Sequence, residues 1–178
     1  MSAVTRTNRV LLGLTVTRVV AALAPASAAA QGLSLAARVP IVIPVGYSTH
    51  GGVGFAPSLN VRLGEHVALG LTAGFIYYSE GDHSERDIPV LVGATYVFRD
   101  PGALARPYVE LRTGYTYSSG SERSSHFLTL MGGTGVLLRT TRSLTLDLGF
   151  DLVAPDLRGN SRDPLGLMLK VGVVYSLL

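Results

Sequence analysis

The sequence contains no cysteine and no tryptophan, and only 15% of its residues are charged. The absence of cysteine excludes disulfide bonds and a lipid-modified N-terminal cysteine. After residue 30, no apolar stretch approaches the roughly 20 residues that a membrane-spanning helix needs. Yet 47% of the residues are hydrophobic and the mean hydropathy is +0.36. Such a chain must distribute its apolar side chains singly, as alternation along β-strands does.

The N-terminal segment has the features of a secretory signal peptide. Arg6 and Arg9 form a positive start, residues 10–16 are mostly apolar, and residues 26–30 offer small side chains for cleavage. Because Arg18 interrupts the apolar region, the alternative is an amphipathic helix that remains on the protein.

We therefore expect a signal peptide over residues 1–30 and one domain over residues 31–178. The signal segment holds three of the 15 basic residues and none of the 12 acidic residues, so the remaining chain carries equal numbers of both. The pI of 9.4 is consequently no indication of a nucleic-acid partner, and no nucleic acid is expected.

From residue 33 onward the dominant period is two, which is the period of a β-strand. Leu144, Leu146 and Leu148, for example, alternate with Thr145 and Asp147. Each alternating segment has about 10 to 13 residues, the length of a tilted membrane-spanning strand. The eight segments are 33–45, 53–63, 67–77, 88–98, 107–117, 126–138, 144–153 and 165–178.

Segment 126–138 is the least regular of the eight. It is apolar and rich in glycine on both faces, so the sequence leaves its register open. A buried helix is the alternative, but Gly132, Gly133 and Gly135 disfavour it.

The connections between the segments alternate in character. Longer loops on one side and shorter turns on the other are typical of an up-and-down outer-membrane barrel. The sequence therefore predicts an all-β fold, an eight-stranded antiparallel up-and-down transmembrane β-barrel. The expected loops are 46–52, 79–87, 118–125 and 154–164, and the expected turns are 64–66, 99–106 and 140–143.

Side-chain size separates this fold from a soluble lipocalin-like binding barrel, which also alternates. One face carries Leu, Val, Ile and aromatics, which suit lipid, and the other carries Gly, Ala, Ser and Thr, which suit a narrow lumen. We place all the aromatic residues at strand ends, in two interfacial belts. Near the loops these are Tyr47, Phe55, Phe75, Tyr77, Tyr78, Tyr115, Tyr117, Phe127 and Phe150, and near the turns Tyr96, Phe98, Tyr108 and Tyr175.

Charged residues also fall on the small-residue face. On the lipid face, each mid-membrane Arg would cost about 2–4 kcal/mol, so we place them in the lumen. Buried charges need partners, and we expect Glu110 and Arg112 to share theirs within this set. The set is Arg38, Arg62, Arg112 and Lys170 against Glu110, Asp147 and Asp151.

Two prolines bear on the closure of the barrel. Pro40 and Pro44 have the same parity, so both missing N–H groups would have pointed to one neighbouring strand. We expect these gaps on the seam with segment 165–178, because an edge tolerates proline best.

With the strands placed, residues 33–178 resemble the small outer-membrane barrels of the opacity-protein and outer-membrane-protein-X type. The resemblance is carried by RPYVELRTGYTY at 106–117, the glycine-rich strand after it, and LMLKVGVVYSLL at the end. It implies a bacterial outer-membrane location and a last strand that the barrel-assembly machinery reads. In that family the last strand ends in an aromatic residue; Tyr175 fits, although Leu177 and Leu178 follow it.

Some barrels of this size are lipid-modifying hydrolases with a His and a Ser on the wall. The candidates are His50, His83 and His126, with Ser48, Ser124 and Ser125 nearby. No obvious carboxylate accompanies them to orient a histidine, so we expect no catalytic residues and interpret His126 as a polar interface residue. His66, in a tight turn, is expected to be solvated.

No cofactor or metal site is expected either. Asp82, His83, Glu85 and Asp87 offer donors for a cation, but without a fixed motif spacing they indicate a solvated acidic loop. The glycines at 132–135 are not a phosphate loop, because no Lys follows them.

These features predict a non-enzymatic, monomeric outer-membrane barrel with a role in envelope structure or surface interaction. Its expected partners are outer-membrane lipid, lipopolysaccharide, the assembly machinery and an extracellular partner at the four loops. The alternatives are a lipid-modifying hydrolase, a narrow pore and a soluble lipocalin-like binding barrel. Side chains fill an eight-stranded barrel, so negligible conduction is expected.

We predict that the mature protein begins at or near Gln31, because the segment before it has the features of a cleaved export signal. Mass spectrometry of membrane-extracted protein should show a chain without residues 1–30. An intact Met1 on the folded membrane protein would contradict export by this signal.

Overall fold

The computed structural model describes residues 30–43, 51–80, 83–100, 102–120, 124–154 and 166–177. Within these ranges no helix combines the length and apolar character required to cross a membrane. The strands are β1 (Ala30–Ile43), β2 (Gly52–Leu63), β3 (Val67–Ala73), β4 (Phe75–Glu80), β5 (His83–Val97), β6 (Ala105–Gly120), β7 (Ser124–Arg139), β8 (Leu144–Ala154) and β9 (Gly166–Ser176).

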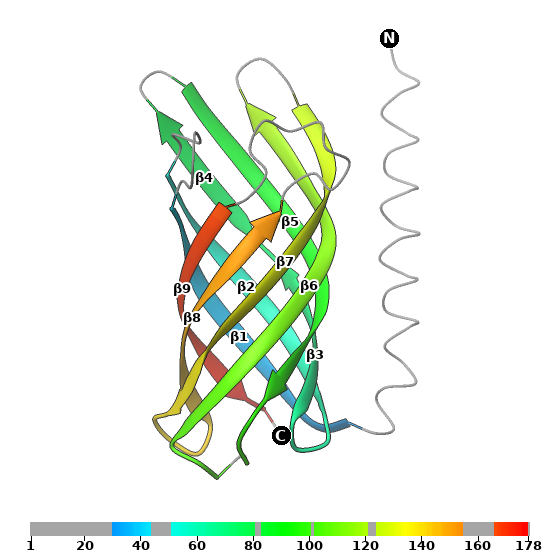
Figure 1. Ribbon diagram of the computed structural model, residues 1–178, viewed down its shortest axis with the longest axis vertical. Coiled ribbons are helices and arrows are strands. Elements are labelled where there is room, and N and C mark those ends of the chain that lie inside the picture. The colour runs from blue at the N-terminus through cyan, green and yellow to red at the C-terminus, as the bar shows by residue number, and fades with distance from the viewer. Residues whose placement is uncertain are drawn as a thin grey trace.

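The strands form a closed antiparallel barrel (Figure 1). Apart from β3 and β4, strands that follow one another along the chain pair with each other, and β1 pairs with both β2 and β9, which closes the sheet. Because β3 and β4 both pair with β2 and with β5, they occupy a single position. The barrel therefore has the predicted eight strand positions, and the up-and-down topology is confirmed.

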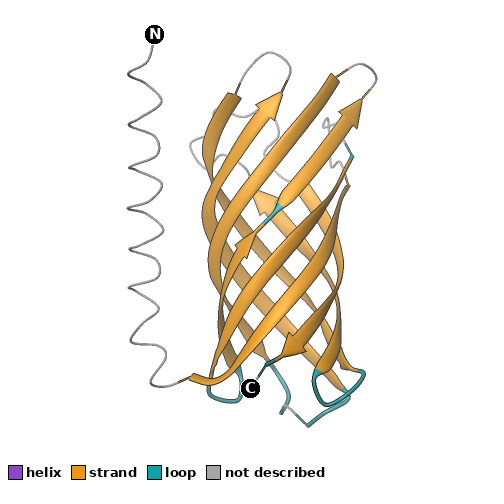
Figure 2. Cartoon of the chain, turned by 180° about the vertical axis from the view of Figure 1, so that it is seen from behind, coloured by secondary structure: helices purple, strands orange, loops and turns teal. Residues whose placement is uncertain are grey.

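β3 and β4 are one strand interrupted at Gly74, which Figure 2 shows as a short break in the wall. The Gly74 N–H donates to the Pro89 carbonyl at 2.8 Å, but Pro89 has no N–H to return the bond. On the other side, continuing the register brings Pro57 of β2 opposite Ala73, again without a donor. The expected strand over 67–77 thus lacks two ladder bonds but keeps its register.

The strands on the loop side are longer than predicted. β4 and β5 remain paired to Glu80 and His83, and β6 and β7 to Ser119 and Ser124. The predicted loops 79–87 and 118–125 are therefore wrong, because backbone pairing continues through their polar residues. Pro44 and the greater part of the expected loops 46–52 and 154–164 lie outside the described residues. The turns 64–66 and 140–143 are as predicted, and β6 begins at Ala105, inside the expected turn 99–106.

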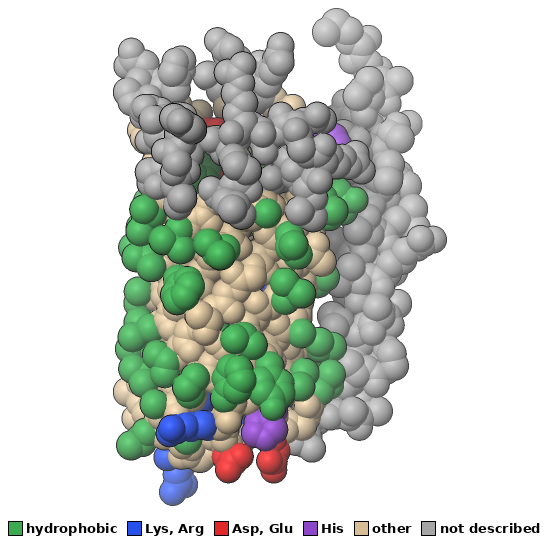
Figure 3. All heavy atoms as spheres, in the orientation of Figure 1, with side chains coloured by type: hydrophobic (Ala, Val, Ile, Leu, Met, Phe, Trp, Pro, Cys, Tyr) green, Lys and Arg blue, Asp and Glu red, His purple; other side chains and the backbone are tan. Residues whose placement is uncertain are grey.

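The outer wall of the barrel is apolar. Hydrophobic side chains are spread over the face seen in Figure 3, with charged groups and a histidine at the turn end. Leu111 and Tyr115 in β6 are each 59% exposed, and Phe98 is 55% exposed. A soluble monomer rarely exposes a continuous apolar surface of this extent. The assignment of the large residues to the outer face is confirmed, and this face suits lipid.

The prediction that all aromatic residues form outer belts is wrong for three of them. Tyr108 is 1% exposed inside the lumen, and Tyr78 and Phe127 line a lumen cavity. Tyr108 has the same parity as Glu110, so strand alternation turns both side chains inward. Tyr108 lies near the end of its strand, but its position in the alternation still turns the side chain inward.

Pro40 does not weaken the seam between β1 and β9, contrary to the prediction. The Leu33 carbonyl accepts from the Leu177 N–H at 2.8 Å, so odd residues of β1 turn their backbone polar groups toward β9 and even residues toward β2. The missing N–H of Pro40 therefore falls on the β2 ladder, where the pairing lapses between positions 38 and 41. The seam to β9 is continuous over residues 34–43 of β1.

The structure fixes the register of β7, which the sequence left open. Met131 and Thr129 are buried in the lumen, so the odd positions face inward. Gly133 therefore lies on the inner face opposite Asp151, whereas its neighbour Gly132 faces out.

We predict that Gly133→Ala destabilises the barrel and Gly132→Ala does not. A Cβ on Gly133 would overlap Asp151 Oδ1 and approach the Phe150 carbonyl to 2.6 Å, whereas the atom nearest a Cβ on Gly132 is Leu111 Cδ1 at 3.8 Å. Overpacking of this kind costs about 1–3 kcal/mol. Urea unfolding of both variants in detergent measures the difference, and equal stabilities would contradict the register.

Candidate functional site in the barrel lumen

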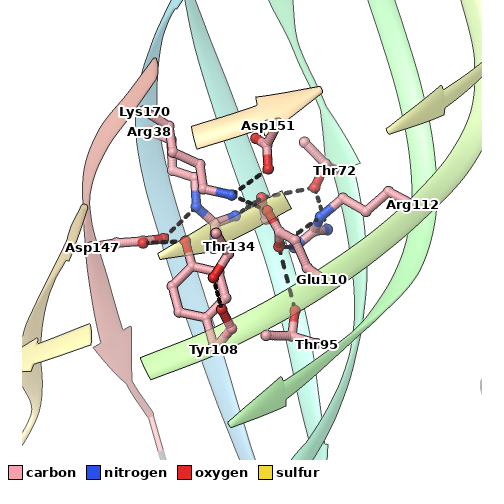
Figure 4. A network of polar contacts seen from close by, with 11 residues as sticks. Arg38, Thr72, Thr95, Tyr108, Glu110, Arg112, Thr134, Asp147, Asp151 and Lys170 are labelled. Atoms are coloured by element: carbon pink, nitrogen blue, oxygen red, sulfur yellow. Dashed lines mark hydrogen bonds and ion pairs between the residues drawn. The ribbon is translucent and has the colours of Figure 1, made fainter. Parts of the chain in front are cut away.

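Glu110 lies at the centre of a polar network that crosses the lumen (Figure 4). Its carboxylate accepts hydrogen bonds from Arg112 Nε at 3.1 Å and Nη2 at 2.9 Å, and it pairs with the Lys170 ammonium. The three side chains are at most 2% exposed. Lys170 comes from β9, which does not adjoin β6, so this contact spans the interior. The expectation that Glu110 and Arg112 point inward is confirmed.

Asp147 forms a second centre of the network. It accepts from Arg38 Nε at 2.6 Å and from the Tyr108 hydroxyl at 2.7 Å, and it is fully buried. Arg38 also donates to Ser58 Oγ at 3.0 Å. One carboxylate thus connects β1 and β6 through β8.

Lys170 joins the network to a third carboxylate. Its ammonium donates to Asp151 Oδ1 at 2.7 Å and lies 5.2 Å from the centre of the Tyr108 ring. On the opposite wall, Arg112 Nη1 donates to Thr72 Oγ1 at 2.7 Å. Since β3, β6, β8 and β9 all contribute, the network ties distant parts of the wall together.

Glycines on the inner face make room for these long side chains. A Cβ at Gly172 would come within 2.8 Å of Arg38 Cγ, and one at Gly149 would come within 2.6 Å of Lys170 Cε. The small residues that the sequence places on this face therefore have a specific role, because charged side chains lie flat across them.

The network is balanced, with three basic and three acidic members. Arg62 was expected to belong to it, but it has no ion pair within the ranges that the structure describes. Instead Arg62 and Arg106 line a small cavity of about 60 Å³ at the turn end of the lumen. Arg106 is buried, and its Nε has no partner among the described atoms. The sequence interpretation missed Arg106 by placing it in a turn, although its parity matches Glu110.

A larger cavity of about 270 Å³ lies above the network, toward the loop end. We call it the loop-end cavity. Its floor includes Glu110 and Lys170, and its wall carries a buried apolar cluster of Leu91, Met131 and Met168. The network thus lies between this cavity and the small one at the turn end, and side chains do not fill the lumen above it.

Two acidic residues of the supposed loop 79–87 belong to this cavity. Glu85 and Asp87 lie in β5 with the inward parity of Leu91, and both line the cavity. Their interpretation as a solvated acidic loop is therefore wrong for Asp87, which is half-buried. Asp82 lies outside the described residues, and for His83 the structure describes the backbone.

The histidine and serine candidates are not brought together in the described part of the chain. His126 is exposed and lies opposite Tyr117 on the outer face. Ser125 precedes it and has the opposite parity, so their side chains leave the strand on opposite faces. Ser124 shares the outward parity of His126, but no hydrogen bond joins these two side chains in the described part of β7. His50 and Ser48 lie outside the described residues.

His66 is more constrained than a solvated turn residue. Its Nδ1 is 2.9 Å from the Val97 carbonyl oxygen. Its ring stacks on that of Tyr96, with the two ring centroids 5.7 Å apart. Glu65, His66 and Asp100 bring one ligand atom each within 4.8 Å of one another. These donors suit a divalent transition metal ion. The sequence could not show this, because Asp100 comes from a different turn.

No family model matches the sequence, and no curated protein sequence matches it. Several solved structures, however, have the same fold as this chain. The N-terminal barrel domain of Pseudomonas aeruginosa OprF has a TM-score of 0.64 and 17% identity, covering 83% of this chain and 98% of that one. Neisserial surface protein A has a TM-score of 0.57 and 18% identity, covering 80% of this chain and 94% of its own. Ail, the attachment invasion locus protein of Yersinia pestis, has a TM-score of 0.54 and 14% identity, covering 82% of this chain and 97% of its own. The fold is that of a small outer-membrane β-barrel.

This fold agrees with the resemblance that the strand sequences indicated. Nearly the whole length of each of the three compared chains is matched, so the likeness concerns the complete barrel. At identities of 14 to 18%, the likeness establishes the fold and assigns no role to individual residues.

We predict that Glu110→Ala lowers the free energy of unfolding by about 3–5 kcal/mol, because it leaves the buried Arg112 guanidinium without a carboxylate. Glu65→Ala in an exposed turn should change it by less than about 0.5 kcal/mol. Urea unfolding in detergent, followed by circular dichroism, measures both. Equal effects would mean that position 110 is solvated.

Proposed function

We propose that the protein is a non-enzymatic outer-membrane barrel that acts through its surfaces and not as a channel. The observation that carries this is the network of Glu110, Arg112 and Lys170, which crosses the lumen at its middle. Its members are buried and bonded to one another, so an ion would have to break charged contacts to pass.

The outer wall supports a position in the outer membrane. Its apolar side chains match lipid, and the alternation on the last strand offers the assembly machinery the pattern described above. Outer-membrane lipid and lipopolysaccharide are the partners that this wall suits. Each barrel closes on itself without a second chain, which supports a monomer.

The loop end supports a role in surface interaction. There β4 and β5, and likewise β6 and β7, remain paired through polar residues, so backbone hydrogen bonds hold these residues in place at the end of the barrel. Ail, which shares the fold, has been solved in complex with the heparin analogue sucrose octasulfate and in a phospholipid bilayer nanodisc. We extend to this chain the idea of a barrel that meets lipid along its wall and another molecule at its end.

We predict that the purified protein forms no stable open channel in planar bilayers or liposomes. The physical reason is the network across the lumen, which places buried, mutually bonded charged side chains between the two cavities. Liposomes with a known open porin are the positive control, and protein-free liposomes are the negative one. Reproducible open channels in the unmodified protein would refute the proposal and favour the narrow pore.

A further inference from the structure

The loop-end cavity combines an apolar wall with acceptors that lack partners. Leu91, Met131 and Met168 are buried on its wall, with Val42, Ile76 and Val153 packed against them. This apolar surface lies inside the barrel, where lipid does not reach it. An apolar wall of this kind in a water-filled lumen is costly to hydrate, so it favours an apolar guest.

Two polar atoms on the same cavity are buried without a hydrogen-bond partner in the described structure, and both are carboxylate oxygens. One is Asp151 Oδ2, on a residue with no exposed surface, and the other is Asp87 Oδ1. A buried carboxylate oxygen without a donor costs free energy. Neither oxygen has accessible surface in this arrangement, so a donor reaches it once its carboxylate turns toward the cavity.

The basic groups of the cavity are already committed. Lys170 lies between Glu110 and Asp151, and Arg112 donates to Glu110 and Thr72. Arg38 donates to Asp147 and Ser58. The charged side chains that line the cavity or bond its lining are Arg38, Arg112 and Lys170 against Glu85, Asp87, Glu110, Asp147 and Asp151. The excess charge is negative.

We propose that the loop-end cavity binds a small organic cation, in which an ammonium group is attached to an apolar body. The Asp151 carboxylate turns toward the cavity and accepts from the ammonium group at the floor. The apolar body lies on the methionine wall, and Asp87 adds a second acceptor nearer the loop end. A carboxylate guest would meet excess negative charge. A neutral apolar guest would leave both oxygens unpaired.

Size narrows the class of ligand. An engineered apolar cavity of about 150 Å³ binds benzene, so a cavity of about 270 Å³ suits an amine of roughly ten heavy atoms. The charge distribution also favours entry of a cation from the loop end, because the excess acids lie there and the basic residues Arg62 and Arg106 lie at the turn end.

Methionine-methyl NMR tests this directly. The chain has three methionines, and Met131 and Met168 both line the cavity, while Met1 precedes the barrel. The protein, labelled at the methionine ε-methyl carbon, is placed in nanodiscs of zwitterionic lipid and titrated with hexylamine. Hexanol and hexanoate, which have the same chain, are the matched probes. Met131→Leu and Met168→Leu assign the signals.

Hexylamine should shift both cavity methyls saturably, with hexanol binding at least about tenfold more weakly because it cannot form a charge-assisted bond. Asp151→Asn and Asp87→Asn should each weaken hexylamine binding by about fivefold or more, and Glu65→Gln in the exposed turn should not change it. Asp87 makes no ion pair among the described residues, so Asp87→Asn keeps the test valid if Asp151→Asn does not fold. Equal binding of hexanol, tighter binding of hexanoate, unchanged binding to Asp87→Asn, or no saturable shift would each overturn the proposal.

Discussion

The pairing of Glu110 with Arg112 and Lys170 is the interaction on which the rest of the lumen depends. A carboxylate at 1% exposure is stable only with cationic partners at hydrogen-bond distance. Arg112 lies two residues along the same strand, Lys170 reaches Glu110 from β9 across the lumen, and each of them bonds further residues. Lys170 reaches Asp151, and Arg112 reaches Thr72. The position of the Glu110 carboxylate thus determines where side chains from different strands are linked across the lumen.

The network also divides the lumen into two regions of opposite chemistry. Toward the loop end lie an apolar cluster and an excess of carboxylates, with Asp87 and Asp151 each retaining an unpaired oxygen. Toward the turn end lie Arg62 and Arg106 around a smaller cavity. The separation follows from the network, because it uses nearly all the donors and acceptors at the middle of the barrel.

The wall tolerates several local defects because closure supplies register from both sides. Pro40, Pro57 and Pro89 each remove a ladder donor, yet the registers of the flanking residues are unchanged across the gaps. In an open sheet a missing bond at an edge invites slippage, whereas in a closed barrel a slip of one strand would turn its apolar side chains into the lumen. The contrast between the apolar outer face and the charged inner face therefore fixes the register of each strand.

The sequence alone determined the strand number, the topology and the direction of most side chains, because a period of two on eight segments is a local property of the chain. It also identified seven of the charged lumen residues, since parity places them on the small-residue face, although Arg62 lies outside the central network. It did not determine which cation meets which carboxylate, because Lys170 and Glu110 are brought together by curvature across the barrel and not by spacing. Tyr108 and Arg106 could have been assigned to the lumen by parity, yet their nearness to a turn obscured it. The loop-end cavity and its unpaired carboxylate oxygens were decided by the tertiary structure, because a cavity depends on the side chains of all the surrounding strands at once.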